Sequence, residues 1–104
     1  GVMLFTQDAI ENKKEEIKAL YRAYNRAIIY IKKEPLENYI EVLIAKSGFP
    51  DTIKNTLTLP DYQKASMPSE KEFKGVLDWL YSKQLINSSY SLDELSYNSF
   101  VEKN

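Results

Sequence analysis

The chain of 104 residues contains neither cysteine nor histidine. Their absence excludes metal sites built from imidazole or thiolate, acid–base catalysis by histidine, and Cys–His or Ser–His nucleophiles. Glycine occurs only three times, and no glycine belongs to a phosphate-binding loop. No apolar run approaches the roughly 18 residues that a membrane-spanning helix needs. The net charge of −1 supplies no bulk field that would attract nucleic acid or an anionic membrane.

The longest segment without glycine or proline covers residues 9–33, and its apolar side chains recur at steps of three, four and seven. This period predicts one long amphipathic helix. Asn12 and Glu15 have the spacing of a capping box, so we expect a short helical turn from about Gln7 and a main helix from about Lys13. Pro35 should end this helix at Glu34. The predicted apolar stripe comprises Ile10, Ile17, Leu20, Tyr21, Tyr24, Ile28 and Ile31.

The same helix carries two further stripes at four-residue steps. Three alanines would allow another backbone to approach closely, which suggests more than one packing neighbour. Four cations on the far face could contact nucleic acid, but acidic residues lie among them and no aromatic residue is interleaved. We therefore interpret that face as solvated. The alanines are Ala19, Ala23 and Ala27, and the cations are Lys14, Lys18, Arg22 and Arg26.

Shorter helices are predicted along the rest of the chain. Pro35 should begin a helix that ends at Gly48 and packs as an antiparallel hairpin on the first helix through an apolar face of Leu36, Tyr39, Ile40, Leu43 and Ile44. Pro50 should open a brief turn over residues 51–55. Residues 57–68 should be irregular but lie against the body. Ser69 and Ser91 each begin a capping box, and the helix after Ser69 should run to about Lys83. We expect Phe73, Val76, Leu77 and Leu80 to face inward, Trp79 to be partly exposed, Leu85 and Ile86 to return to the core, Tyr97, Phe100 and Val101 to dock, and residues 102–104 to fray.

Val2, Met3, Leu4 and Phe5 form a continuous apolar run, which suits a strand buried on both faces. The rest of the sequence contains no second convincing strand, and one strand cannot satisfy its own backbone groups. The run could be a simple apolar lead into the helix. We favour the interpretation that the remainder of the sheet belongs to residues outside this chain. No signal peptide is present, and the opening at Gly1 looks like a boundary within a longer polypeptide.

Adjacent carboxylates occur at three places and could suggest acid–base catalysis. Each pair lies in the first turn of a predicted helix, where exposed amides and the helix dipole account for acidic residues. We therefore expect the chain not to be an enzyme and to need no metal or cofactor. The pairs are Glu15 with Glu16, Glu70 with Glu72, and Asp93 with Glu94.

The order of several motifs resembles the C-terminal part of substrate-binding proteins of ABC importers. The group covers nitrate, sulfonate and taurine binders and the thiamine-precursor (THI5-like) proteins. The chain departs from the pattern at Asn12-Lys13, where the family often has Asn-Pro, and at Gln84, where a glycine cap is usual. The matching motifs are the strand closing on Phe5-Thr6, Ala23-x-x-x-Ala27, Ala27-Ile28-Ile29-Tyr30-Ile31, Glu34-Pro35-Leu36, Pro68-Ser69-x-x-x-Phe73, Asp78-Trp79-Leu80, Leu85-Ile86 and Ser91-Leu92-Asp93-Glu94-Leu95.

The resemblance implies a mainly α chain of four to five helices with one short N-terminal β-strand. Residues 1–104 would be a single partial domain, the C-terminal helical part of lobe one in an α/β, two-lobed type II periplasmic-binding-protein fold. The whole protein would be an extracytoplasmic lipoprotein that closes on a small molecule and delivers it to an ABC permease. The family's ligand contacts lie mostly earlier in the chain, so the only implied candidates here are Phe5 and Thr6, near the hinge.

Two other functions are compatible with the residues. The chain could be a self-contained helical protein-interaction module, which should be a stable monomer without an exposed strand. A helical enzyme or nucleic-acid binder fits the residues least well. If the importer interpretation holds, the chain alone should self-associate through Val2, Met3, Leu4 and Phe5.

Overall fold

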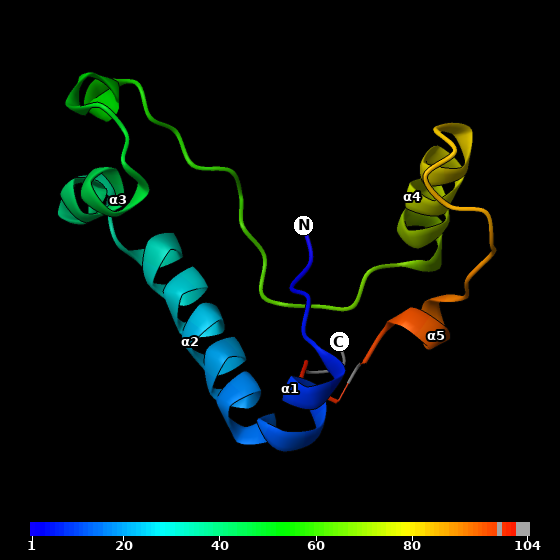
Figure 1. Cartoon of the computed structure of the whole chain (residues 1–104). Coiled ribbons are helices and arrows are strands. Elements are labelled where there is room, and N and C mark those ends of the chain that lie inside the picture. The colour runs from blue at the N-terminus through cyan, green and yellow to red at the C-terminus, as the bar shows by residue number, and fades with distance from the viewer. Residues whose placement is uncertain (98, 102–104) are drawn as a thin grey trace. The chain divides into compact units, whose positions relative to one another are not determined.

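The computed structural model describes residues 1–97 and 99–101, and these residues are mainly α-helical (Figure 1). Within these residues, five α-helices and two 3-10 helices follow one another. This number of helices agrees with the sequence prediction. The elements are α1 (Gln7–Asn12), α2 (Lys14–Lys33), η1 (Leu36–Asn38), α3 (Ile40–Ser47), η2 (Asp51–Asn55), α4 (Glu70–Ser82) and α5 (Leu92–Leu95).

The chain forms two compact units. Unit 1 consists of residues 1–18 together with the described residues from 65 onward, and unit 2 consists of residues 19–64. Helix α2 begins in unit 1 and continues into unit 2. Unit 2 contains η1, α3 and η2, whereas α1, α4 and α5 belong to unit 1.

The expected break before the long helix is present. The hydroxyl oxygen of Thr6 accepts a hydrogen bond from the amide of Ala9 at 3.1 Å and so caps α1. Helix α1 includes Asn12, whose side-chain amide donates to Asp8 at 2.8 Å. The carbonyl of Lys13 accepts the first helical hydrogen bond of α2, from the amide of Ile17. The cap of α2 is therefore one residue later than the Asn12 capping box that the sequence suggested.

Proline ends α2 as predicted, but the next helix is interrupted. Pro35 has φ −60° and ψ 145°, so it precedes the 3-10 helix η1 rather than the first turn of an α-helix. Tyr39 then breaks the helical path with φ −138° and ψ 1° before α3 begins. Gly48 ends α3 in the left-handed conformation with φ 68°, as its position predicts. The turn at Pro50 that forms η2 is also confirmed.

Three isoleucines make the small core of unit 2. Ile28 on α2 and Ile40 and Ile44 on α3 are each at most 5% exposed. The apolar periodicity predicted all three as inward-facing. The predicted antiparallel hairpin of α2 and α3 is wrong, however, because α3 packs mainly on the adjacent 3-10 helices η1 and η2. The break at Tyr39 explains this difference, since α3 leaves the end of α2 in a new direction (Figure 1).

Both serine capping boxes predicted after residue 68 are present. In each box the serine hydroxyl accepts from the amide of a glutamate three residues later, and that glutamate accepts from the serine amide. These boxes begin α4 after Ser69 and α5 after Ser91. The segment between η2 and α4 is irregular, as expected, and the hydroxyl of Tyr24 donates to the carbonyl of Gln63 within unit 2 at 3.2 Å.

The predicted N-terminal strand is not formed, because the described residues contain no strand that could pair with it. Residues 1–6 are neither helix nor strand. Val2 is 68% exposed, Met3 39% and Leu4 87%, while Phe5 is half-buried. The mainly α class therefore holds, and its β element does not.

Three predictions of burial are also wrong. Val76, assigned to the inner face of α4, is 58% exposed, and Leu85, expected in the core, is 62% exposed. Leu20, placed on the apolar stripe of α2, is 46% exposed. Trp79 is 55% exposed, as its position on the helix predicts. The rings of Tyr97 and Phe100 lie 4.9 Å apart between centroids. The predicted fraying of residues 102–104 falls outside the described residues.

Gln84 ends α4 in an unusual backbone conformation. Its φ of 57° is left-handed, and the amide of Leu85 donates to the carbonyl of Leu80 at 3.0 Å, which is the closing bond of a glycine-type helix end. A side chain in this conformation costs about 1 kcal/mol relative to glycine. We expect Gln84→Gly to raise the free energy of unfolding of α4 by about this amount, measured by urea denaturation followed through the fluorescence of Trp79.

Gly48 provides a control in which the expected change of stability has the opposite sign. Beyond its two chain neighbours, no atom lies within 4 Å of a Cβ added there, so Gly48→Ala tests the backbone cost alone. We expect it to lower the free energy of unfolding of unit 2 by about 1 kcal/mol. A Gln84→Gly variant that is less stable than the parent chain would contradict the assignment of this helix end.

None of the helices in the described part of the chain has the length and apolar character to cross a membrane.

Candidate functional site

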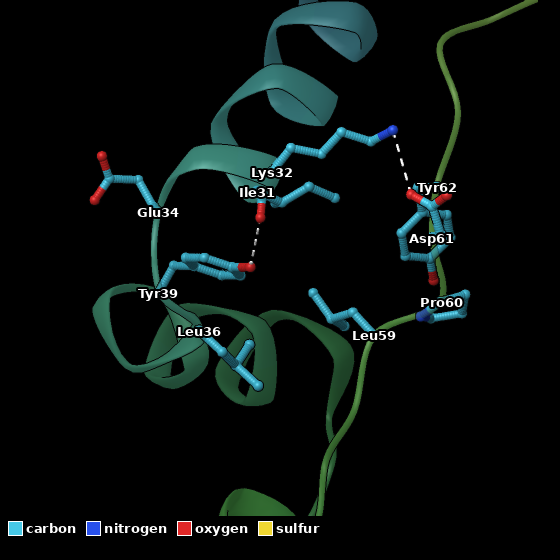
Figure 2. Close-up of a pocket in the computed structure, with 9 residues that line it drawn as sticks. All are labelled: Ile31, Lys32, Glu34, Leu36, Tyr39, Leu59, Pro60, Asp61 and Tyr62. Atoms are coloured by element: carbon cyan, nitrogen blue, oxygen red, sulfur yellow. Dashed lines mark hydrogen bonds and ion pairs between the residues drawn. The ribbon is translucent and has the colours of Figure 1, made fainter.

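A hollow of about 290 Å³ lies at the end of α2 in unit 2. Three segments surround it: the last turns of α2, the η1 region, and the extended chain at residues 59–62 (Figure 2). Its volume is near the lower limit for small-molecule pockets. The lining residues are Ile31, Lys32, Glu34, Leu36, Tyr39, Leu59, Pro60, Asp61 and Tyr62.

Local interactions connect the end of α2 to both of the other segments. The side chain of Lys32 reaches across to Asp61, with 3.2 Å between Nζ and Oδ1 (Figure 2). The hydroxyl of Tyr39 donates to the carbonyl of Ile31 at 3.4 Å, and the Tyr39 ring meets the Tyr30 ring edge-on at 5.7 Å. Because Lys32 and Asp61 are both largely exposed, their ion pair contributes at most about 1 kcal/mol.

The chemistry of the hollow favours apolar contact. Aliphatic and aromatic side chains form most of its wall, including Leu36 and Leu59. The charges of Lys32 and Asp61 compensate each other, and the carboxylate of Glu34 points away from the hollow (Figure 2). The arrangement can accept an uncharged apolar group, either of a small molecule or of another polypeptide.

The hinge-proximal residues suggested by the family resemblance do not line this hollow. The Thr6 hydroxyl is engaged in capping α1, and Phe5 is half-buried beside it. The hollow itself was missed in the sequence, because it depends on how residues 59–62 pass the end of α2. Residues 59–62 were predicted only as part of the irregular segment that lies against the body.

The four cations on α2 are also mostly solvated. Lys14, Arg22 and Arg26 are exposed, and Lys18 pairs with Glu15 at 2.8 Å within the same helix. This pairing follows the three-residue helical spacing. Among the described residues, no group of three or more acidic side chains is arranged to hold a metal ion.

Two of the three carboxylate pairs serve as helix caps. The amide and hydroxyl of Ser69 donate to Glu72, each at 2.9 Å, and hold the pKa of that carboxyl below its ordinary value. Ser91 acts in the same way on the pKa of Glu94. A general acid needs a raised pKa, so these shifts have the wrong direction for that role.

Because of these two caps, we expect the helicity of α4 and α5 to depend on pH. Because the pKa of Glu72 and that of Glu94 are lowered in the folded state, their stabilisation is complete above the ordinary value of about 4.5 and is lost as pH falls through the lower folded value. We expect a carboxyl NMR titration to place both midpoints below 4.5. Glu72→Gln should remove the acid-dependent loss of helicity in α4. A midpoint at or above 4.5 would contradict the capping geometry.

The comparisons with known proteins give no relative: no protein-family model, curated protein or solved structure matches the chain.

Proposed function

We propose that this chain is the helical C-terminal part of the substrate-binding protein of an ABC importer for a small molecule of the nitrate, sulfonate, taurine or thiamine-precursor type. Its helices would cover a sheet contributed by the rest of the first lobe. The whole protein would be an extracytoplasmic lipoprotein that closes its two lobes on the ligand and then docks on a permease. Ligand contacts would lie mostly outside residues 1–104, and catalysis would play no part.

The observation that carries this proposal is the exposure of the N-terminal apolar run. Val2 and Met3, which point to opposite sides in an extended chain, are 68% and 39% exposed, and Leu4, on the same side as Val2, is 87% exposed. A strand that is apolar on both faces is typical of a sheet covered on both sides. The described residues contain no sheet that residues 2–5 could join. An edge strand supplied by the rest of a lobe would satisfy both its backbone and its side chains.

Exposed apolar side chains in the later part of the chain support the same interpretation. Trp79 is 55% exposed, Leu85 62% and Leu95 59%. Helices that cover a sheet need such apolar faces.

The hollow at the end of α2 has a place in this proposal. Its apolar wall, with Leu36, Tyr39 and Leu59, would receive an apolar side chain from the body of the lobe. This role needs no charged ligand group, which agrees with the mutual compensation of Lys32 and Asp61.

The test starts from the locus that encodes the chain. We expect the reading frame to continue upstream of the codon for Gly1 and to encode a secretion signal with a lipid-attachment cysteine. The polypeptide from the complete frame should gain thermal stability with nitrate, taurine or a thiamine-precursor pyrimidine, and residues 1–104 alone should not. A start codon directly before Gly1 would overturn the proposal. So would a complete polypeptide that none of these compounds stabilises.

The second candidate is a self-contained helical protein-interaction module. The observation that favours it is the core of unit 2, since the buried residues Ile28, Ile40 and Ile44 all belong to residues 19–64. A module would keep these contacts and use an exposed helical face to bind another protein. It requires no upstream sequence, so the same examination of the locus separates the two candidates.

A further inference from the structure

Charge is distributed unevenly between the two units. Residues 19–64 carry seven cations and five acidic residues, a net charge of +2, whereas the whole chain has a net charge of −1. Two of the acidic residues of unit 2 are compensated within it, Asp61 by Lys32 and Glu41 by Lys54. Unit 2 therefore keeps an excess of cations although the chain as a whole is slightly acidic.

Three cations of unit 2 lie along one face of α2, which we call the basic face: Arg22, Arg26 and Lys33. All three are exposed, and none forms an ion pair among the described residues. On a helix with 3.6 residues per turn, they project within about 40° of one another along about 16 Å of helix. Glu15 lies on the same line seven residues before Arg22, and its charge is compensated by Lys18 at 2.8 Å.

A broad hollow of about 650 Å³ adjoins the basic face, and Arg26 and Lys33 line it. Ile29 and Tyr30 lie between these two cations in the sequence, also line the hollow, and are 40% and 48% exposed. The hollow thus combines two cations with apolar surface and the amphipathic ring of a tyrosine. Its remaining lining residues are Ala23, Ala27 and Glu34, and the Glu34 carboxylate accepts a hydrogen bond from the side-chain amide of Asn38 at 2.9 Å.

The spacing of the cations determines which kind of anion they fit. Arg22 and Arg26 are separated by about 6 Å along the helix axis, and Lys33 lies about 10.5 Å beyond Arg26. A single phosphate or carboxylate group is too small to match a row of this length. A flat array of anionic groups matches it, because all three cations project to the same side of α2. The headgroups of anionic lipids form such an array, and tyrosine is enriched at the same level of a bilayer.

We propose that the basic face of α2 binds the anionic headgroups of a lipid membrane, with Ile29 and Tyr30 at the headgroup level. This inference rests on the proposed function, because a lipid anchor on the whole protein would hold the basic face at high local concentration beside a membrane surface. The attraction is electrostatic, so it should weaken as salt screens it.

The test is cosedimentation of the full 104-residue chain with lipid vesicles. At about 0.1 M salt we expect binding to phosphatidylcholine vesicles that contain about 30% phosphatidylglycerol, and loss of this binding at about 1 M salt. Arg26→Gln and Lys33→Gln should each weaken the partition about fivefold, and the double variant about 25-fold, because each cation near an anionic surface contributes separately.

Lys46→Gln on α3 is the matched control. It removes an exposed cation of the same unit that forms no ion pair among the described residues and lies outside the basic face, so the partition should change less than about twofold. Far-UV circular dichroism of each variant verifies that the helices are retained. A control that weakens the partition as much as Arg26→Gln would overturn the proposal.

Three further outcomes would also overturn it. Equal binding to vesicles of phosphatidylcholine alone would assign lipid contact to the N-terminal apolar run. Loss of vesicle binding with millimolar inorganic phosphate at constant ionic strength would indicate a site for a free anion. Binding to a polyglutamate peptide without binding to vesicles would assign the basic face to an acidic polypeptide. None of these outcomes bears on the upstream reading frame, so a failure of this inference is distinguishable from a failure of the importer proposal.

Discussion

Replacing Ile44 by alanine is expected to lower the free energy of unfolding of unit 2 by about 2–4 kcal/mol. Ile44 is 4% exposed and belongs to a core of only three isoleucines, so few neighbouring side chains can move to fill the cavity. Such a loss is a large fraction of the stability available to a small unit. Amide hydrogen exchange in α3, compared between the parent chain and Ile44→Ala, measures the effect directly.

Val42 gives the matched control in the same helix. It is 60% exposed, so Val42→Ala removes almost no buried surface and should change the stability by less than about 0.5 kcal/mol. Equal effects of Ile44→Ala and Val42→Ala would contradict the assignment of the core. A difference of at least about 2 kcal/mol would support it.

Ile17→Ala should have a comparable effect on unit 1. Ile17 is 4% exposed and lies in the first part of α2, which belongs to this unit. Trp79, the only tryptophan of the chain, also lies in unit 1, so its fluorescence reports the unfolding of that unit. We expect the urea transition of Trp79 to show a loss of about 2–4 kcal/mol.

The control for this prediction is Val76→Ala on the exposed side of α4. Val76 lies in the same helix as Trp79 and is 58% exposed, so its truncation should move the fluorescence transition by less than about 0.5 kcal/mol. A fluorescence transition that Ile17→Ala leaves unchanged would show that Ile17 does not stabilise the unit containing Trp79.

Local features of the fold were predictable from the sequence because a few adjacent residues determine them. The serine caps at Ser69 and Ser91 follow from a hydroxyl and a carboxylate three residues apart. The end of α2 follows from Pro35, and the end of α3 follows from Gly48. The period of the apolar residues also identified the isoleucines that are buried.

Features that depend on distant segments were not predictable. The apolar character of Val2 and Leu4 suggested a strand, but a strand requires a neighbour that the described residues do not provide. Val76 and Leu85 are apolar, yet burial needs an element that covers them. The apolar residues therefore indicated which surfaces could be buried. Which of these surfaces are in fact buried depends on the arrangement of the chain.

The hollow at the end of α2 illustrates the same limit at the candidate site. Its walls combine Ile31 and Tyr39 with Leu59, which is 20 residues further along the chain than Tyr39. The irregular segment before α4 has no periodicity from which its path could be deduced. The Tyr39 break between η1 and α3 was missed as well, since the apolar spacing on both sides of it continues a helical pattern.

The central claim is that the N-terminal apolar run pairs with a sheet supplied by the rest of a longer protein. Amide hydrogen exchange of Met3 and Leu4 tests it most directly, in residues 1–104 alone and in the polypeptide from the complete reading frame. We predict rapid exchange in the chain alone and exchange slowed at least about 100-fold in the longer polypeptide, because strand hydrogen bonds protect amides. Amides that are already protected in the chain alone, or that stay unprotected in both, would contradict the claim.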